Sequence, residues 1–452
     1  MLSYYLQLAW LSVRRTPVMS LLMILTLAVG VAVSMTMLTL QHVMSTNGLA
    51  AKNDTLYALQ IDNASAGDGG TSSGNKLTNG LPYLLSYRTV TTLLRSDIPL
   101  HQVAMHRWAA ALSLENNQVR PSKELVRVTS RDFFALFGVP FIYGQVWDKS
   151  ADNDARYQVV IDRTMNQRLF NGENSVGRSL QLDGRPYQVV GVVEDFNPLP
   201  SVQDLTQGAF GGNASIYLPF GLHRALQMMP YGSMTYSSSH PRPQPQEPLT
   251  PEQQYEQILQ ERYFWMQYWV ELPDADTKNA FVSYLRNYFD EQRKTDFFER
   301  DFKYALSTPS QWLALNQVVS NDTRVMTWLA LVFLAVCIIN TIALLLAKLL
   351  KQAPETGIRR ALGASRSAIF IQNLVESGVI GVLGGLLGIA LSQLGLGLVR
   401  TLVSRDEAAV VYSDGLTLLL TIALALLASI IAGCYPAWRV SRTSPAYYLK
   451  NQ

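Results

Sequence analysis

Three long apolar stretches in the C-terminal third of the sequence constrain this chain more than any other feature. They cover residues 325–347, 367–399 and 415–438, and charged residues flank each of them. A helix that crosses a bilayer needs about 20 apolar residues at about 1.5 Å of rise each. A fourth stretch, residues 18–40, lies alone near the N-terminus. The sequence therefore predicts an α-helical membrane protein with four transmembrane helices, one before and three after a large polar region.

The distribution of charge predicts how these helices are oriented. Residues 46–323 carry 24 Lys/Arg and 29 Asp/Glu, whereas Glu355 is the only acid among the basic residues near the predicted cytoplasmic ends. An excess of Lys and Arg in short loops marks the cytoplasmic side. We therefore expect both termini and the loop after the second span in the cytoplasm, and the large domain outside. The basic residues that carry this signal are Arg14, Arg15, Lys348, Lys351, Arg359, Arg360, Arg366, Arg439, Arg442 and Lys450.

The first span is predicted to be a retained anchor. Its apolar core of 23 residues is longer than the about 7–15 residues of a secretory signal. Ahead of it, apolar residues from Leu2 to Val13 share one helical face. This spacing predicts a helix in the cytoplasm or at the membrane interface, and the alternative is a simple extension of the first span. The only cysteines, Cys337 and Cys434, fall inside predicted spans, so the outer domain must be stable without disulfides.

The large region is predicted to be an α+β domain. Its strand and helix patterns recur near both ends, which suggests two related α/β halves with an inserted, proline-rich subdomain over about residues 196–262. Strands are predicted at 55–61, 157–162 and 265–272, and helices at 84–95, 164–170 and 274–294. The predicted segments are an interfacial helix 1–17, spans 18–44, 324–348, 367–400 and 415–438, the outer domain 45–323, a cytoplasmic helix 349–366, an outer loop 401–414 and a cytoplasmic tail 439–452.

Signatures that would identify an enzyme are absent from the sequence. No Gly-Lys dipeptide occurs, so there is no P-loop to bind nucleotide phosphates. The histidines form no HExxH motif, and His101 and His106 are expected on opposite faces of a strand. We expect no catalytic, cofactor or metal-binding residues in this chain. The pI near 8.7 follows from the membrane orientation signal, and nucleic-acid binding is not expected.

Residues 348–372, KLLKQAPETGIRRALGASRSAIFIQ, form the most informative segment. Pro354 suits the first position of a helix, Glu355 and the Arg359-Arg360 pair match the helix dipole, and Gly363 favours a left-handed C-cap. A short amphipathic helix is therefore predicted between the second and third spans. The alternative is a connector that only supplies positive charge to the lipid surface.

Small residues recur at a four-residue spacing in the third predicted span. Such rows allow helix backbones to approach closely, either within this chain or against a partner. Glu376 is the one acid inside a span; an intramembrane carboxylate is a functional candidate, although its position after Arg366 also fits the inner interface. The predicted packing residues are Ser377, Gly381 and Gly385 in one row and Gly384, Gly388 and Ser392 in another.

Three separate regions of the sequence resemble one family. The segment ETGIRRALGAS with the following Gly384-Gly385, the ending GCYPAWRVSRTSPAYYLK, and the stretches RDFFALFGVPFIYGQ and VVIDRTMNQRLFNGENSVGRSLQLDGRPYQVVGVVEDF are similar to MacB/FtsX-like permeases of ABC transporters. These permeases combine a MacB-type periplasmic core domain with an FtsX-like transmembrane domain. The chain departs from the family at residues 351–354, where the family is usually more charged and lacks proline, which hints at a permease specialised within an unlike pair.

The resemblance implies two permeases, identical or paralogous, in the bacterial inner membrane, each with a porter-like periplasmic domain. A separate cytoplasmic ATPase dimer would bind ATP and Mg and drive export of a substrate from the periplasm or outer leaflet, with a periplasmic membrane-fusion adaptor and an outer-membrane channel as further partners. Alternatives are a lipoprotein-extracting permease and an FtsX-like activator of a cell-wall hydrolase. The resemblance assigns ATPase coupling to Glu355, Thr356, Gly357, Ile358, Arg359, Arg360, Ala361, Leu362 and Gly363.

Overall fold

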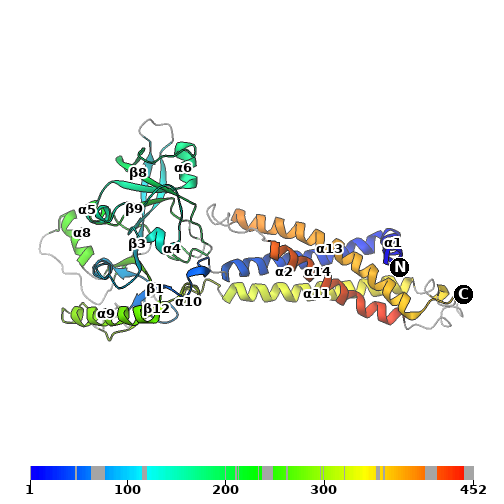
Figure 1. Ribbon diagram of the computed structural model, residues 1–452. Helices are drawn as coiled ribbons and strands as arrows, with labels where there is room; N and C mark the ends of the chain where they lie inside the picture. The colour runs from blue at the N-terminus through cyan, green and yellow to red at the C-terminus, as the bar shows by residue number, and fades with distance from the viewer. Residues whose placement is uncertain are drawn as a thin grey trace. The chain divides into compact units, whose positions relative to one another are not determined.

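The chain folds into two compact units, an α/β unit (Ser45–Val318) and a helical unit (Met1–Met44 with Val319–Gln452) (Figure 1). The structure is a computed structural model. It describes residues 2–45, 48–62, 77–114, 120–198, 200–208, 211, 213–232, 234–236, 248–260, 263–295, 297–298, 300–319, 321–352, 357–359, 362–402 and 415–441.

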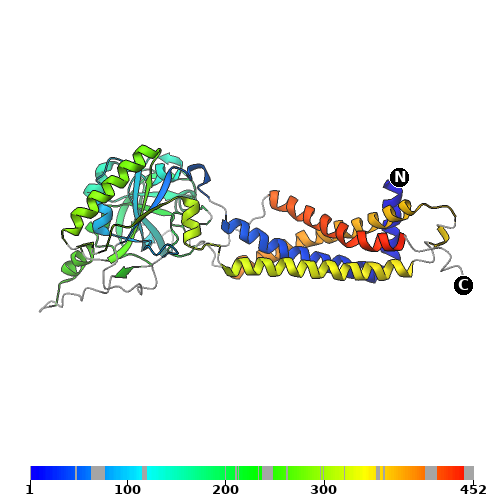
Figure 2. The ribbon, with the colours of Figure 1, turned by 90° about the horizontal axis from the view of Figure 1, so that it is seen from below.

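The long helices of the helical unit run beside one another in both views (Figures 1 and 2). Among the described residues, three helical segments are long and apolar enough to cross a membrane: Pro17–His42, Asp322–Lys351 and Arg366–Leu398. The last helix has a shorter apolar part in the described residues, Leu426–Val440, so the fourth span stays a prediction. The helices are α1 (Leu2–Arg15), α2 (Pro17–Ser45), α11 (Asn321–Lys351), α13 (Arg366–Leu402) and α14 (Gly415–Ser441).

Apolar side chains from α2, α11, α13 and α14 meet inside the helical unit. One cluster joins Met23 of α2, Leu345 and Leu349 of α11, Ile380 of α13 and Val440 of α14. These residues lie near the start of α2, the end of α11 and the end of α14. This packing places the start of α2, the segment between α11 and α13, and the end of α14 at one end of the bundle.

A single sheet of 12 strands forms the α/β unit. Its order is β12-β1-β11-β3-β4-β9-β6-β8-β5, with β2, β7 and β10 paired to its side. Only the β4–β9 and β6–β8 pairs are parallel. The strands are β1 (Leu56–Ile61), β2 (Leu85–Ser86), β3 (His101–Ser113), β4 (Ser122–Thr129), β5 (Phe141–Gly144), β6 (Gln158–Asp162), β7 (Ser179–Leu182), β8 (Arg185–Val193), β9 (Ile216–Pro219), β10 (Thr235–Tyr236), β11 (Tyr263–Glu271) and β12 (Tyr304–Ser307).

In the described part of the unit, two large hydrophobic cores lie along this sheet. The first surrounds β11, all nine residues of which are buried, and is covered by α9, whose apolar face includes Phe281, Leu285 and Phe289. The second surrounds β6 and β8 and is covered by α6. The helices are η1 (Ala50–Lys52), α3 (Tyr87–Leu93), α4 (Phe133–Phe137), α5 (Lys149–Asp154), α6 (Arg163–Phe170), α7 (Leu222–Ala225), α8 (Pro251–Gln260), α9 (Ala275–Arg293) and α10 (Pro309–Leu315).

The region of residues 196–262, which the sequence predicts as an inserted subdomain, contributes a strand to the sheet. Strand β9 from this region lies inside the sheet, between β4 and β6, and all four of its residues are buried. The strand was missed because four residues are too few to show a strand pattern beside a proline-rich loop. The two cores therefore share one continuous sheet.

The chain enters and leaves the α/β unit side by side. Strand β1 pairs with β12 in an antiparallel ladder. Beside it, the Asn53 side-chain oxygen accepts hydrogen bonds from the Ser310 backbone N–H at 3.1 Å and from its hydroxyl at 2.8 Å. Lys52 also donates to the Ala135 carbonyl at 2.9 Å and pairs with Glu271 at 3.1 Å. These contacts fix both ends of the unit against the sheet.

A buried carboxylate joins three strands at the border between the two cores. Arg107 of β3 and Arg127 of β4 lie directly opposite each other, and two like charges in that position repel. Asp204 accepts hydrogen bonds from Arg107 Nε at 2.5 Å, from Arg127 Nη1, and from Gln267 Nε2 of β11 at 2.5 Å. Burial alone would raise the pKa of Asp204, but the charges of Arg127 and Arg107 outweigh burial and hold this pKa below its ordinary value.

We expect Asp204→Asn to lower the free energy of unfolding of the α/β unit by about 3–5 kcal/mol, because it leaves two buried guanidinium groups without a counter-charge. Denaturant unfolding of residues 45–318 measures this change. Glu194→Gln is the matched control, since it removes one carboxylate from an ion pair with Arg163 whose side chains are 38% and 59% exposed; the expected loss is below about 1 kcal/mol. Equal losses in the two variants would contradict the role assigned to Asp204.

Two neutral histidines are buried together on the sheet. The rings of His106 and His223 lie 4.5 Å apart between centroids. His106 Nδ1 donates to the Arg107 carbonyl at 3.0 Å, and His223 Nε2 lies 3.0 Å from the Tyr255 hydroxyl. Among the described residues, His106 Nε2 and His223 Nδ1 have no hydrogen-bond partner. Burial lowers the pKa of His106 to about 4 and lowers the pKa of His223 as well.

Because these histidines are buried in the neutral form, we expect acid to destabilise the α/β unit. The unfolded chain protonates a histidine near pH 6.5, whereas folded His106 stays neutral down to about pH 4, so stability is lost as the pH falls through this window. His106 alone would contribute about 3 kcal/mol at about 1.4 kcal/mol per pK unit. Asp152 and Asp162, whose pKa values burial raises to about 6, act in the opposite direction. Both aspartates are present in wild type and in His106→Asn. Their contribution to the pH dependence of stability therefore cancels when the unfolding of the two proteins is compared between pH 7 and 4. Parallel stability curves for the two proteins would contradict the prediction.

Candidate functional site

The segment between α11 and α13 is the first candidate site. Helix α11 ends at Lys351 and α13 begins at Arg366, so residues 352–365 connect them at the end of the bundle that also carries the start of α2. Within this segment residues 357–359 are helical. Four of the predicted coupling residues lie outside the described residues: Glu355, Thr356, Arg360 and Ala361.

The end of this segment has the geometry that its sequence predicts. Gly363 has a φ of +104°, which a residue with a side chain rarely adopts. The Leu362 N–H donates to the Ile358 carbonyl at 3.0 Å, and the Ala364 N–H donates to the Arg359 carbonyl at 3.1 Å. Arg359 also donates to Gln372 of α13 at 3.3 Å. The short turn of helix is therefore closed by Gly363 and tied to α13.

This segment exposes large apolar side chains. Leu362 is 83% exposed and Ile358 is 49% exposed, and four-residue spacing places them on the same side of a helical turn. Three exposed residues of this end of the bundle, Lys351, Arg359 and Arg366, are basic. An apolar pair within a basic surface is suited to contact another protein.

The small residues of α13 are buried inside the helical unit. A Cβ added to Gly384 would lie 3.1 Å from Leu27 Cδ2, and one added to Gly388 would lie 3.1 Å from Val31 Cγ1, both on α2. Ser377, a member of the other row, packs against Gly433 of α14. A Cβ added to Gly433 would lie 1.9 Å from the Ser377 hydroxyl. Gly381, Gly385 and Ser392 are also buried. In this chain these residues permit close contacts with α2 and α14.

Glu376 forms an ion pair that sequence reasoning missed. Its Oε1 lies 2.6 Å from Lys348 Nζ of α11, and the two side chains are 3% and 0% exposed. Lys348 was counted only as an orientation signal in the sequence, yet it is buried. The available signal was a lysine near the end of one span together with a single acid in the next.

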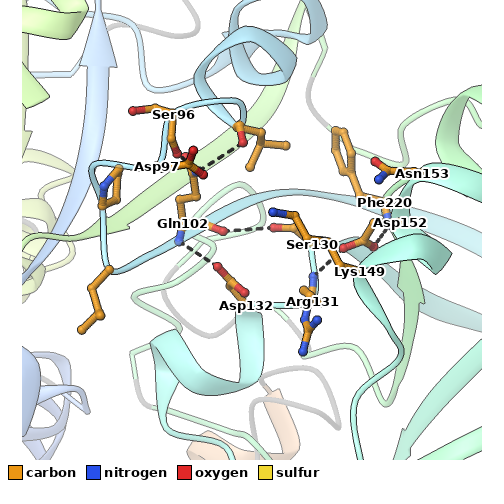
Figure 3. A pocket seen from close by; sticks show the side chains of 13 residues that line it. Ser96, Asp97, Gln102, Ser130, Arg131, Asp132, Lys149, Asp152, Asn153 and Phe220 are labelled. Carbon is orange, nitrogen blue, oxygen red and sulfur yellow. Dashed lines mark hydrogen bonds between the residues drawn. The ribbon is translucent and has the colours of Figure 1, made fainter.

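A polar pocket of about 440 Å³ lies on the α/β unit (Figure 3). Asp152 stabilises one side of it by accepting hydrogen bonds from the Arg131 N–H at 3.0 Å, Trp147 Nε1 at 2.8 Å and the Phe220 N–H at 3.1 Å. On the other side, Gln102 Nε2 donates to the Ser96 carbonyl at 2.6 Å. Among the described residues, no group of three His, Cys, Asp or Glu side chains could hold a metal ion.

Comparison with known proteins assigns most of the chain to two family models. Residues 20–288 match the MacB-like periplasmic core domain, and residues 328–445 match the FtsX-like permease C-terminal domain. Among curated relatives, the macrolide export ATP-binding/permease protein MacB 2 of Yersinia pestis bv. Antiqua (strain Antiqua) is 24% identical over 332 residues, which cover 72% of this chain and 41% of the relative. MacB of Acinetobacter baylyi is 24% identical over 324 residues, covering 72% of this chain and 42% of that protein. The chain thus spans less than half the length of these relatives.

A solved structure is also similar to this chain. The crystal structure of the periplasmic region of MacB from Actinobacillus actinomycetemcomitans aligns with a TM-score of 0.36 and 14% identity, covering 61% of this chain and 98% of that one. The family models carry the assignment, because the periplasmic-domain model alone matches more than half of the residues. The α/β unit is therefore a periplasmic domain, and the apolar helices are those of an inner-membrane protein. The chain belongs to the MacB/FtsX-like family of ABC transporter permeases.

Proposed function

We propose that this chain is the permease subunit of a MacB-type transporter that exports a substrate from the periplasm or the outer leaflet. ATP binding and hydrolysis in a separate cytoplasmic ATPase dimer would move its periplasmic domain through the helices. The observation that carries this proposal is the exposed Ile358–Leu362 pair on the segment between α11 and α13. The printed sequence contains no P-loop, so the energy source must be another polypeptide segment.

Charge at one end of the bundle supports a cytoplasmic location for that segment. Exposed Arg14 and Arg15 lie in the last turn of α1, and Lys351, Arg366 and Arg439 lie at the ends of the long helices on the same side. Basic residues concentrated beside apolar helices mark the cytoplasmic face. Both termini and residues 352–365 would then face the cytoplasm, and a fourth span formed by α14 would complete the arrangement.

This orientation predicts the accessibility of two exposed serines, Ser283 of α9 and Ser367 at the start of α13. In cells with a permeabilised outer membrane, Ser283→Cys should react with a membrane-impermeant maleimide, whereas Ser367→Cys should react only after the inner membrane is opened. Both variants also carry Cys337→Ala and Cys434→Ala, so that no native cysteine of the sequence reacts with the maleimide. Labelling of Ser367→Cys in intact inner membranes would reverse the proposed topology.

The outer face of α11 supports a second permease as partner. Among the described residues, seven large apolar residues on this helix are more than half exposed in the single chain: Val325, Met326, Trp328, Leu329, Val332, Val336 and Ile339. Asn340, in the middle of the same helix, is also exposed. A polar amide facing hydrocarbon favours association with another helix that can hydrogen-bond to it. A paired permease, identical or paralogous, would supply that helix.

We expect Leu362→Glu to prevent association with the ATPase. The substitution places a charge where an exposed leucine would be buried against the partner, and loss of such a contact costs about 2 kcal/mol or more. Co-purification of the two subunits from membranes should fall at least about tenfold, since about 1.4 kcal/mol is a factor of ten. The probe is the separate ATPase subunit that this proposal requires, co-expressed with the permease.

Ser367→Glu is the matched control for this experiment. It adds the same charge to an exposed position a few residues away, and an acid in the first turn of α13 interacts favourably with the helix dipole. Its co-purification should equal that of wild type. If Leu362→Glu also assembles like wild type, the ATPase contact lies elsewhere on the cytoplasmic end of the chain.

A further inference from the structure

A small group of polar side chains is buried at the end of the helical bundle that carries residues 352–365. Its centre is the ion pair between Lys348 Nζ and Glu376 Oε1, at 2.6 Å. Glu376 Oε1 also accepts a hydrogen bond from the Ser12 hydroxyl at 2.6 Å. Lys348 Nζ donates to the Ser20 hydroxyl at 3.1 Å. We call these four residues the Lys348–Glu376 cluster.

Each member of the cluster comes from a different helix. Ser12 lies on α1, Ser20 on α2, Lys348 on α11 and Glu376 on α13. The cluster therefore joins the first two helices of the chain to the two helices that hold residues 352–365. Lys348 lies three residues before the end of α11, and Glu376 lies ten residues after the start of α13. A displacement of the connecting segment would act directly on both charged residues.

The surroundings make the two charges depend on each other. The same helices carry buried apolar residues near the two charges, Leu345 and Leu349 on α11 and Ile380 on α13, together with buried but uncharged Asn373 and Ser377 on α13. A buried charge is strongly destabilising without its partner, whereas an ion pair replaced by apolar residues of similar size is often tolerated. The pair consequently favours one arrangement of these helices, in which the charged groups and both hydroxyls meet.

The outer side of α1 shows why such a contact would matter. Ala9 is 1% exposed on the side that faces the bundle, whereas Tyr4, Trp10 and Leu11 on other sides are 58%, 46% and 52% exposed. A helix with exposed aromatic and aliphatic residues also binds well to the lipid interface. The lipid interface therefore offers α1 a second favourable place, and the Ser12–Glu376 hydrogen bond favours the one against α13.

We propose that the Lys348–Glu376 cluster holds α1 against α13 and transmits movement of residues 352–365 to α1 and α2. This inference rests on the proposed function, because it assigns to the cluster the step that follows contact with the ATPase. Helix α2 continues in sequence into the periplasmic domain. The cluster would thus decide whether movement of the segment reaches the helix that leads to that domain.

The first arm of the test measures the position of α1 without any ATPase. In purified permease in lipid nanodiscs, with both native cysteines replaced by alanine, Ala9→Cys should react slowly with a maleimide. Ser12→Ala removes only the α1 hydrogen bond, and Lys348→Met/Glu376→Met removes the pair without leaving an unpaired charge. Both should increase the reaction rate about tenfold, as expected for a helix that opens more often. Trp10→Cys, already exposed, is the control and should react at the same rate in every variant.

The reversed pair Lys348→Glu/Glu376→Lys separates a specific contact from general stability. A serine hydroxyl both donates and accepts, so Ser12 can accept from a lysine at 376 and Ser20 can donate to a glutamate at 348. Slow labelling of Ala9→Cys should return in this variant. If Ala9→Cys stays protected in Ser12→Ala and in the double methionine variant, apolar packing holds α1 and the proposal is wrong.

The second arm uses the complex with the ATPase subunit. Ser12→Ala leaves residues 352–365 unchanged, so the complex with the ATPase should form. The change in ATPase rate that the permease causes should nevertheless fall to about a third or less of the wild-type change, if α1 is released for most of the ATPase cycle. A complex of Ser12→Ala that shows the wild-type ATPase rate with Ala9→Cys exposed would overturn the transmission role. Failure of the wild-type permease to bind the ATPase would instead refute the proposed function, and the first arm would be unaffected.

Discussion

Hydrocarbon offers no hydrogen-bond partner, and this constraint determines the form of the helical unit. Backbone groups in a membrane must be satisfied within the chain, which long helices achieve. Side-chain hydroxyls obey the same rule here. Thr36 and Thr341 donate to carbonyls one turn earlier in their own helices, at 2.8 Å each, and Ser34 donates to the Ala330 carbonyl of α11 at 2.9 Å. In the described part of the helical unit, the buried charged side chains are Lys348 and Glu376, which form an ion pair. With the hydroxyls of Ser12 and Ser20, this pair connects α1, α2, α11 and α13.

The periplasmic domain also contains buried charged groups that need a partner. Two arginines opposite each other in adjacent strands would separate β3 from β4, and Asp204 reverses this repulsion by lying between them. Gln267 extends the contact to β11. In both units a single carboxylate converts a repulsive or unpaired charge into a cross-link between elements distant in sequence. The two hydrophobic cores of the domain lie on either side of these polar contacts of Asp204.

Local sequence predicted the elements well, because each signal lay within one segment. The long apolar stretches gave helices close to their predicted bounds, and the conformation of Gly363 followed from the residues around it. The pattern at residues 274–294 predicted α9, which Asp274 caps by accepting a hydrogen bond from the Thr277 N–H at 2.7 Å. Contacts between segments were not predictable in this way. Asp204 lies far from Arg107 and Arg127 in the sequence, and the residues around Glu376 do not identify which of the basic residues near the span ends is its partner. Strand β9 was missed since burial by its neighbours, and not its own pattern, makes it a strand.

The side-by-side ends of the periplasmic domain have a mechanical consequence. Strand β1 begins and β12 ends at the same end of their shared ladder, where Ala58 pairs with Ser307, and the ladder continues to Ile61 and Tyr304. A force that drew these two ends apart would break the ladder one hydrogen-bonded pair at a time, starting at Ala58. A force that displaced both ends together would load none of these bonds. The domain therefore follows a common displacement of its two connections as a rigid body, whereas their separation would open it from the edge of the sheet.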